Sequence, residues 1–306
     1  MESSSKFAII VAIAVTILSA NHSRADEIKQ AAPIVQTNYS YEDDAIVVKT
    51  IGKGKDIVLI PGLGSAAEVY DGIIPELAKK NRVHIVQLKG YAGLKLTKEE
   101  GSIFENAQVS IANYIKNKKL KTPTLIGHSM GGELSMAINA RNPNLVSKVL
   151  IVDALTFYSL LFSPQATPQI MEPQAKAFAN MIKGQSAEQY ETNQKTAIAR
   201  LVTSPEKQKL VLDWSINSNR YAIAQGVQDL MTIDLRPELK NSKIPMTLIY
   251  GYDAKMGLSV EQVDNLYKNA YKDVPNMSLK RIDNSLHFIM YDQPAEFSKA
   301  VNEFLK

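Results

Sequence analysis

The stretch LIGHSMGGEL at residues 125–134 contains the spacing G-x-S-x-G, with Ser129 at its centre. A short apolar run that can form a strand precedes it, and residues 133–141 after it are rich in helix formers. The glycines two residues before and after the serine suit a tight turn in which a side chain would collide with neighbouring backbone. A strand, a strained turn and a helix in this order expose a serine hydroxyl at the edge of a sheet. The stretch therefore predicts that Ser129 is a nucleophile.

The rest of the chain alternates short apolar runs with helical patterns. Continuous apolar runs are typical of strands buried on both faces of a parallel sheet, and their alternation with helices predicts right-handed β-α-β units. We therefore expect an α/β protein with a doubly wound, mostly parallel sheet. The predicted strands lie at 45–48, 57–60, 83–86, 125–126, 149–152, 246–250 and 277–279. The predicted helices between them lie at 67–81, 103–117, 133–141, 260–271 and 294–305.

Residues 154–241 interrupt this alternation, because they contain helical patterns and no convincing strand. One of these helices is expected to begin at Ser204-Pro205, since proline is favoured at the first helical position. The simplest expectation is a helical cap inserted over the carboxyl edge of the sheet. The core is then made of residues 26–153 and 242–306.

The first 25 residues have the pattern of a secretory signal peptide. A lysine is followed by an apolar stretch from Phe7 to Leu18, and Ser23 and Ala25 are placed like a small-x-small cleavage site. The apolar stretch is shorter than the roughly 20 residues that span a bilayer. We therefore expect cleavage after Ala25, no stable membrane insertion afterwards, and export to a periplasm or to the medium.

The composition narrows the class of protein. The chain of 306 residues is 45% hydrophobic and 22% charged, which suits one large α/β domain with an insertion. It contains no cysteine, so it has no disulfides and no thiolate metal ligands. Its formal net charge of +4 is too small to indicate nucleic acid as a partner. The sequence makes no prediction of the oligomeric state.

His287 is the histidine best placed to activate Ser129, because a serine hydroxyl needs a neighbouring base that takes its proton. His22 lies in the predicted signal peptide, and His84 lies within an apolar run, where we expect a structural role. Adjacent side chains at a tight turn point apart, which argues against His128. His287 follows a predicted strand late in the chain, so it can reach the carboxyl edge of the sheet, where ligands bind in such folds.

The base in turn needs an acid that fixes its tautomer and stabilises the imidazolium. Asp253 and Asp153 each follow a predicted strand. Asp253 is favoured, since the order Ser129, Asp253, His287 is the chain order of serine hydrolases on this kind of sheet. Asp153 remains the rival acid.

Four stretches together resemble the α/β-hydrolases of the esterase/lipase type: VLIPGLGSAAEVYDGI (58–73), TLIGHSMGGELSMAINARNP (124–143), IPMTLIYGYD (244–253) and RIDNSLHFIMYDQPAEFSKAVNEFL (281–305). The resemblance implies acyl transfer through a serine ester, without a metal or an organic cofactor, and makes the insertion a cap or lid. It also implies an oxyanion hole formed by the backbone N–H groups of Leu63 and Met130. Asp253 stands two residues after Gly251, one closer than in much of the family, which keeps Asp153 open.

The expected function is therefore hydrolysis of a small-molecule carboxylic ester by Ser129, His287 and Asp253. Two alternatives stay open. One is amide or peptide hydrolysis by the same residues, which would need an anionic cap residue to hold a substrate amine. The other is a ligand-binding, receptor-like protein with little turnover. The candidates for the anionic residue are Glu172, Glu188 and Glu191.

Overall fold

The computed structural model describes residues 39–306, so the predicted signal peptide lies outside the described residues. The described strands are β1 (Tyr41–Glu42), β2 (Ile46–Gly52), β3 (Lys55–Ile60), β4 (Asn81–Leu88), β5 (Thr124–His128), β6 (Lys148–Val152), β7 (Met246–Tyr252) and β8 (Met277–Asp283). They form one sheet in the order β1-β2-β4-β3-β5-β6-β7-β8. β1 and β2 pair antiparallel at one edge, β2 pairs antiparallel with β4, and all later neighbours are parallel. The prediction of an α/β fold with a mostly parallel sheet is confirmed.

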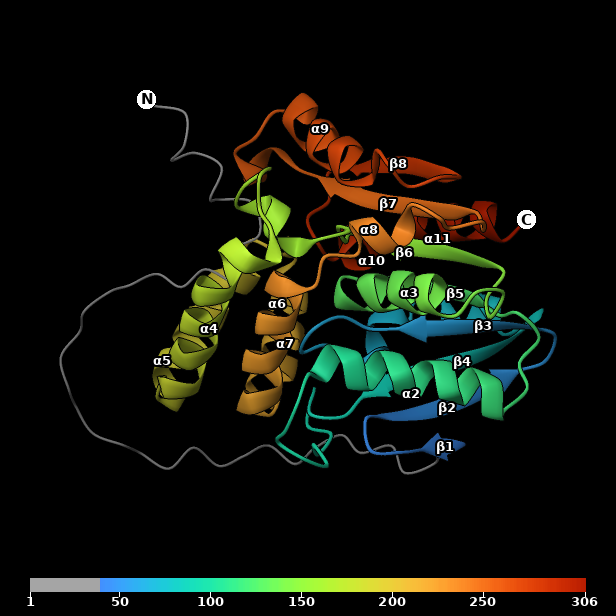
Figure 1. The fold of residues 1–306 in the computed structure, drawn as a ribbon, viewed down its shortest axis with the longest axis horizontal. Coiled ribbons are helices and arrows are strands. Elements are labelled where there is room, and N and C mark those ends of the chain that lie inside the picture. The colour runs from blue at the N-terminus through green and yellow to red at the C-terminus, as the bar shows by residue number, and fades with distance from the viewer. Residues whose placement is uncertain (1–38) are drawn as a thin grey trace.

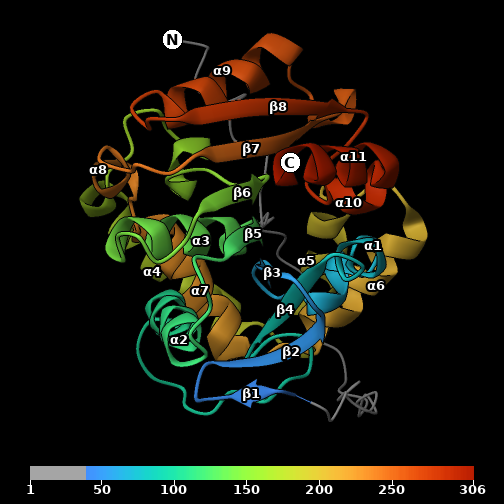
Figure 2. The ribbon, with the colours of Figure 1, turned by 90° about the vertical axis from the view of Figure 1, so that its right-hand side faces the viewer.

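Helices cover both faces of the sheet (Figure 2). One face carries α2 (Ile103–Asn117), α3 (Met130–Arg141) and α9 (Val260–Tyr271), and the other carries α1 (Ile74–Leu77), α10 (Ile289–Asp292) and α11 (Pro294–Leu305). Strand β3 shows why its sequence is continuously apolar. Val58 and Ile60 belong to the core on one face, whereas Ile57 and Leu59 belong to the core on the other. Because side chains alternate along a strand, a strand buried on both faces needs apolar residues at every position.

The chain between β6 and β7 forms helices only: η3 (Tyr158–Leu161), α4 (Pro168–Gly184), α5 (Ala187–Ile198), α6 (Pro205–Ile216), α7 (Arg220–Thr232) and α8 (Arg236–Leu239). Helices α4 to α7 stand as a group beyond one end of the strands (Figure 1). Each of these four helices begins after a residue whose side chain accepts a backbone N–H of the first turn: Thr167, Ser186, Ser204 and Asn219. The described elements between β6 and β7 are thus all helical, and the role of 154–241 as a cap stays a prediction.

The predicted helix at 67–81 does not form as one piece. The chain makes a short 3₁₀ turn, η2 (Ala67–Tyr70), then α1, and enters β4 at Asn81. Pro75 explains the break, because proline lacks an N–H and is tolerated only in the first turn of a helix, where α1 places it. Within residues 39–306, none of the helices combines the length and the apolar character required to span a membrane.

Candidate active site

Ser129 stands between β5 and α3 with a backbone φ of 54°, a value that few residues other than glycine adopt. Its N–H donates to the carbonyl oxygen of Val152 in β6, at 2.9 Å, which fixes the turn to the neighbouring strand. A Cβ atom at Gly127 would lie 2.0 Å from the carbonyl oxygen of Gly131, so no side chain fits there. The strand, tight turn and helix expected around Ser129 are therefore present, and the turn is strained in the way that exposes a nucleophile.

The loop that follows β3 packs directly on this turn. A Cβ atom at Gly62 would lie 3.0 Å from Cβ of Ser129, so glycine allows the loop to approach closely. Met130 is the first residue of α3, and its N–H therefore has no carbonyl partner within the helix. Leu63 follows Gly62 in the same loop. The two segments that carry the N–H groups expected to form an oxyanion hole thus meet at Ser129.

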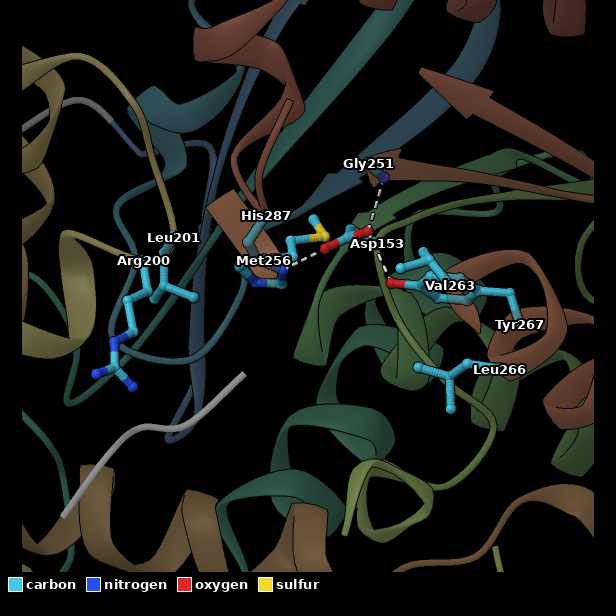
Figure 3. A pocket seen from close by; sticks show the side chains of 9 residues that line it. All are labelled: Asp153, Arg200, Leu201, Gly251, Met256, Val263, Leu266, Tyr267 and His287. Atoms are coloured by element: carbon cyan, nitrogen blue, oxygen red, sulfur yellow. Dashed lines mark hydrogen bonds and ion pairs between the residues drawn. The ribbon is translucent and has the colours of Figure 1, made fainter. Parts of the chain in front are cut away.

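His287 pairs with Asp153, the residue directly after β6 (Figure 3). The distance between Nδ1 of His287 and Oδ2 of Asp153 is 2.6 Å. The other carboxylate oxygen, Oδ1, accepts the backbone N–H of Gly251 at 3.0 Å and the hydroxyl of Tyr267 at 2.9 Å. Asp153 is only 7% exposed, so these donors replace the water that its charge would otherwise bind.

Asp253 does not hold His287, and the predicted pairing is corrected accordingly. Its carboxylate accepts the N–H of Lys255 at 2.8 Å and so caps η4 (Ala254–Met256), the 3₁₀ turn that follows β7. The reason lies in the length of β7, which runs to Tyr252, two residues beyond its predicted end. This extension carries Asp253 past the position that faces His287.

His128 contacts His287 but does not take its place beside Asp153. The ring is fully buried and lies 4.5 Å from the ring of His287, centroid to centroid. Nε2 of His128 donates to the carbonyl oxygen of His287 at 3.1 Å, and its Nδ1 has no hydrogen-bond partner among the described residues. Burial, with the neighbouring His287, lowers the pKa of His128 well below its ordinary value. His128 therefore stays neutral and holds the loop that bears His287 next to the turn at Ser129.

A narrow pocket adjoins the His287–Asp153 pair (Figure 3). Its volume is about 10 Å³, room for about one water molecule and too little for a substrate. Its remaining lining comes from the segment after α5, from β7, from η4 and from α9: Arg200, Leu201, Gly251, Met256, Val263, Leu266 and Tyr267. The side of the pair that carries Asp153 is thus enclosed by other side chains of the protein. Across residues 39–306, no group of three or more histidine, aspartate or glutamate side chains is placed to hold a metal ion.

Sequence reasoning missed Tyr267 and the hydrogen bonds to Asp153. Tyr267 lies inside the predicted helix 260–271, where an aromatic residue at helical spacing indicates only core packing. Its hydroxyl reaches Asp153 across 114 positions of sequence. No local pattern signals such a contact.

Comparison with known proteins agrees with the fold. The family described as alpha/beta hydrolase fold matches residues 56–294. Pimeloyl-[acyl-carrier protein] methyl ester esterase of Aeromonas hydrophila subsp. hydrophila is 23% identical over 267 residues, covering 85% of this chain and 99% of the relative. The sn-1-specific diacylglycerol lipase ABHD11 of Danio rerio is 22% identical over 298 residues, covering 92% and 86%. The crystal structure of the enol-lactonase from Burkholderia xenovorans LB400 has a TM-score of 0.71 at 17% identity, covering 88% of this chain and 99% of that one. Since the family match spans well over half of the sequence, this chain belongs to the alpha/beta hydrolase fold family.

Proposed function

We propose that the protein hydrolyses carboxylic esters, with Ser129 as nucleophile, His287 as general base and Asp153 as the acid. The observation that carries the proposal is the 2.6 Å contact between His287 Nδ1 and Asp153 Oδ2, on a loop packed against the turn at Ser129. The relatives support the bond type, because their names specify a methyl ester and a diacylglycerol. The substrate is a small-molecule ester.

The geometry assigns a role to each group. Asp153 holds the Nδ1–H tautomer of His287, so Nε2 is left as the atom that takes the proton of Ser129. The serine oxygen bonds to the ester carbon, and the N–H groups of Leu63 and Met130 stabilise the oxyanion. The alcohol leaves with the proton from His287. His287 then takes a proton from a water molecule, whose oxygen attacks the carbonyl carbon of the acyl-enzyme. The carboxylic acid product is released, and Ser129 regains its proton from His287.

Amide hydrolysis has less support in the cap. Glu172 pairs with Lys176 at 2.7 Å and Glu191 pairs with Lys195 at 2.7 Å, each pair one turn apart on its own helix. Glu188 lies in the first turn of α5 and is exposed. These carboxylates behave as solvated helix surface, and nothing in their contacts directs them to a substrate amine.

The test is a panel of p-nitrophenyl esters and aminoacyl anilides, together with labelling by a fluorophosphonate. We expect ester turnover, weak anilide turnover and a label on Ser129. Ser129→Ala should lower kcat by at least roughly 10³-fold, because the members of such a triad act as a unit. A folded protein that neither turns over esters nor takes the label would support the receptor-like alternative. Strong anilide turnover would support amide hydrolysis.

Export is also proposed, on the sequence pattern of residues 1–25 alone. The mature chain is expected to begin at Asp26 and to be found in an exported, membrane-free fraction. Intact-mass measurement after expression of the full chain decides this. A species that retains residues 1–25 in the membrane fraction would contradict it.

A further inference from the structure

Asp292, the last residue of α10, connects the loop that bears His287 to the cap. Its Oδ2 accepts the backbone N–H of Leu286 at 2.8 Å. Its Oδ1 accepts both the backbone N–H and the side-chain hydroxyl of Thr203, at 2.8 and 2.7 Å. Thr203 lies between α5 and α6 of the cap. One carboxylate therefore joins the residue before His287 to the cap.

A second hydrogen bond joins the same two segments on the other side of the histidine. The N–H of Phe288 donates to the carbonyl oxygen of Leu201 at 3.0 Å. Both neighbours of His287 are thus fixed to the cap segment 201–203, one directly and one through Asp292. We call these contacts of Leu201, Thr203, Leu286, Phe288 and Asp292 the cap bridge.

The cap bridge matters because His287 must serve two partners at once. Its Nδ1 is held by Asp153, and in the proposed mechanism its Nε2 takes the proton of Ser129. The backbone of the loop sets both distances, and a displacement of about 1 Å in such a geometry can cost roughly 10²-fold in rate. Asp292 contacts this loop at Leu286, the residue before His287.

We propose that Asp292 is a positioning residue that holds His287 in register with Asp153 and Ser129, using the cap as its anchor. The inference rests on the proposed function. A carboxylate suits this role because its two oxygens act only as acceptors, and the three contacts to Asp292 come from donors on two separate segments. An asparagine at this position would place its NH₂ group, a donor, opposite the N–H of Leu286 or the donors of Thr203. The cap and the base then move as one unit.

The experiment compares Asp292→Ala and Asp292→Asn with Thr203→Val, which removes one donor, and Thr203→Ser, which keeps it. Asp283→Asn is the matched control, since Asp283 also lies close before His287 in sequence but pairs with Arg281 on its own strand. Asp292→Ala should lower kcat roughly 10- to 100-fold with KM nearly unchanged. Thr203→Val should show a smaller loss, and Thr203→Ser and Asp283→Asn should match the wild type.

Two further readouts separate positioning from a general loss of stability. In the His287→Ala background, Asp292→Ala should have no additional effect on the residual rate, whereas a structural role would lower it by the same factor as before. The downfield proton resonance of His287 Nδ1–H should broaden or shift in Asp292→Ala and stay in place in Asp283→Asn. Wild-type kcat together with an unchanged resonance in Asp292→Ala would overturn the proposal. Should Asp292→Ala not fold, Thr203→Val decides by the same measurements.

The resonance also keeps the two proposals apart. A wild-type protein that is inactive on every ester would defeat the proposed function. The comparison of Asp292→Ala with Asp283→Asn by this resonance would still show whether Asp292 fixes His287 against Asp153.

Discussion

The ends of β6 and β7 offer a direct comparison, because two neighbouring parallel strands each lead into an aspartate. Asp153 is buried and accepts a tyrosine O–H, a backbone N–H and the Nδ1–H of His287, whereas Asp253 caps the turn that follows it. Val152 pairs with Ile249, and β7 continues for three more residues. At about 3.3 Å per residue, Asp253 lies roughly 10 Å farther along the strand direction than Asp153. Both aspartates follow a strand, so that position alone does not decide which of them pairs with His287. The register of β7 against β6 decides it.

Exchanging the carboxylate at each end is the strongest way to break this comparison. We expect Asp153→Asn to lower kcat by roughly 10⁴-fold, because an amide cannot stabilise the imidazolium and can favour the wrong tautomer of His287. Asp253→Asn should stay within about twofold of the wild type. Steady-state ester kinetics measure both, and melting curves show whether each variant is folded. A severe loss at Asp253 with a mild one at Asp153 would restore the assignment favoured by the sequence.

Gly251 tests how closely the His287 loop must approach the end of β7. A Cβ atom at this position would lie 2.5 Å from the carbonyl oxygen of Leu286 and 2.8 Å from that of Ser285. Gly251→Ala must therefore push the loop away. We expect the free energy of unfolding to fall by about 1–3 kcal/mol, as for other overpacked sites. We also expect the variant to lose most of its ester turnover. Denaturant unfolding and kinetics measure the two effects. Gly72→Ala is the control, since no atom lies within 4 Å of a Cβ added there.

Glu133 gives a test of the Asp153 end by the dependence of stability on pH. It is a buried carboxyl group of α3, on the same face of the sheet as Tyr271. The hydroxyl of Tyr271 donates to the carbonyl oxygen of Ala154, the residue after Asp153. Oε2 of Glu133 has no partner among the described residues, and burial raises the pKa of Glu133 well above the ordinary 4.5. The folded protein then keeps a proton that the unfolded chain releases, so this group lowers stability as pH rises above about 4.5.

Glu133→Gln removes this titration. The stability of the variant relative to the wild type should therefore increase with pH, by at most about 1.4 kcal/mol per pH unit. Denaturant unfolding from pH 5 to 9 measures the trend. Glu303→Gln is the control, since Glu303 is exposed and its pairing with Lys280 lowers its pKa, so its variant should show no such increase. A flat difference for Glu133→Gln would mean that this carboxyl is ionised in the folded protein.

The parts of the molecule that the sequence predicted well depend on local pattern. Apolar runs located strands β2 to β8, and the glycine spacing located the turn at Ser129, because both are dictated by neighbouring residues. His84 also met its expected structural role, bonded to Asp56 and to Tyr114. The sequence favoured Asp253 over its rival Asp153, because the pairing with His287 depends on the register of β6 against β7. It gave no sign of Asp292, whose partners Leu286 and Thr203 come from two separate segments. Contacts between distant segments leave no periodic signal in the chain.

Tyr267→Phe tests the smallest expected effect, because the hydroxyl of Tyr267 contacts Asp153 and not Asp253. This hydroxyl donates to Asp153 Oδ1 at 2.9 Å, and the N–H of Gly251 donates to the same oxygen at 3.0 Å. Tyr267→Phe removes one of the two donors to Oδ1, so Asp153 should stay buried but be held less firmly. A hydrogen bond to a charged group contributes about 1.5–3 kcal/mol, and the remaining donor offsets part of the loss. We expect kcat to fall roughly three- to tenfold with KM nearly unchanged.

Tyr250→Phe is the matched control for this change. The rings of Tyr250 and Tyr267 lie 4.4 Å apart, but the hydroxyl of Tyr250 donates to Asp264 and not to Asp153. Both variants lose one hydroxyl from the same aromatic pair, so an effect on packing alone should appear in both melting curves. Only Tyr267→Phe should lower kcat. Equal kinetics for the two variants would show that Gly251 alone suffices to hold the acid, and that the buried hydroxyl at the end of β6 serves the stability of the fold.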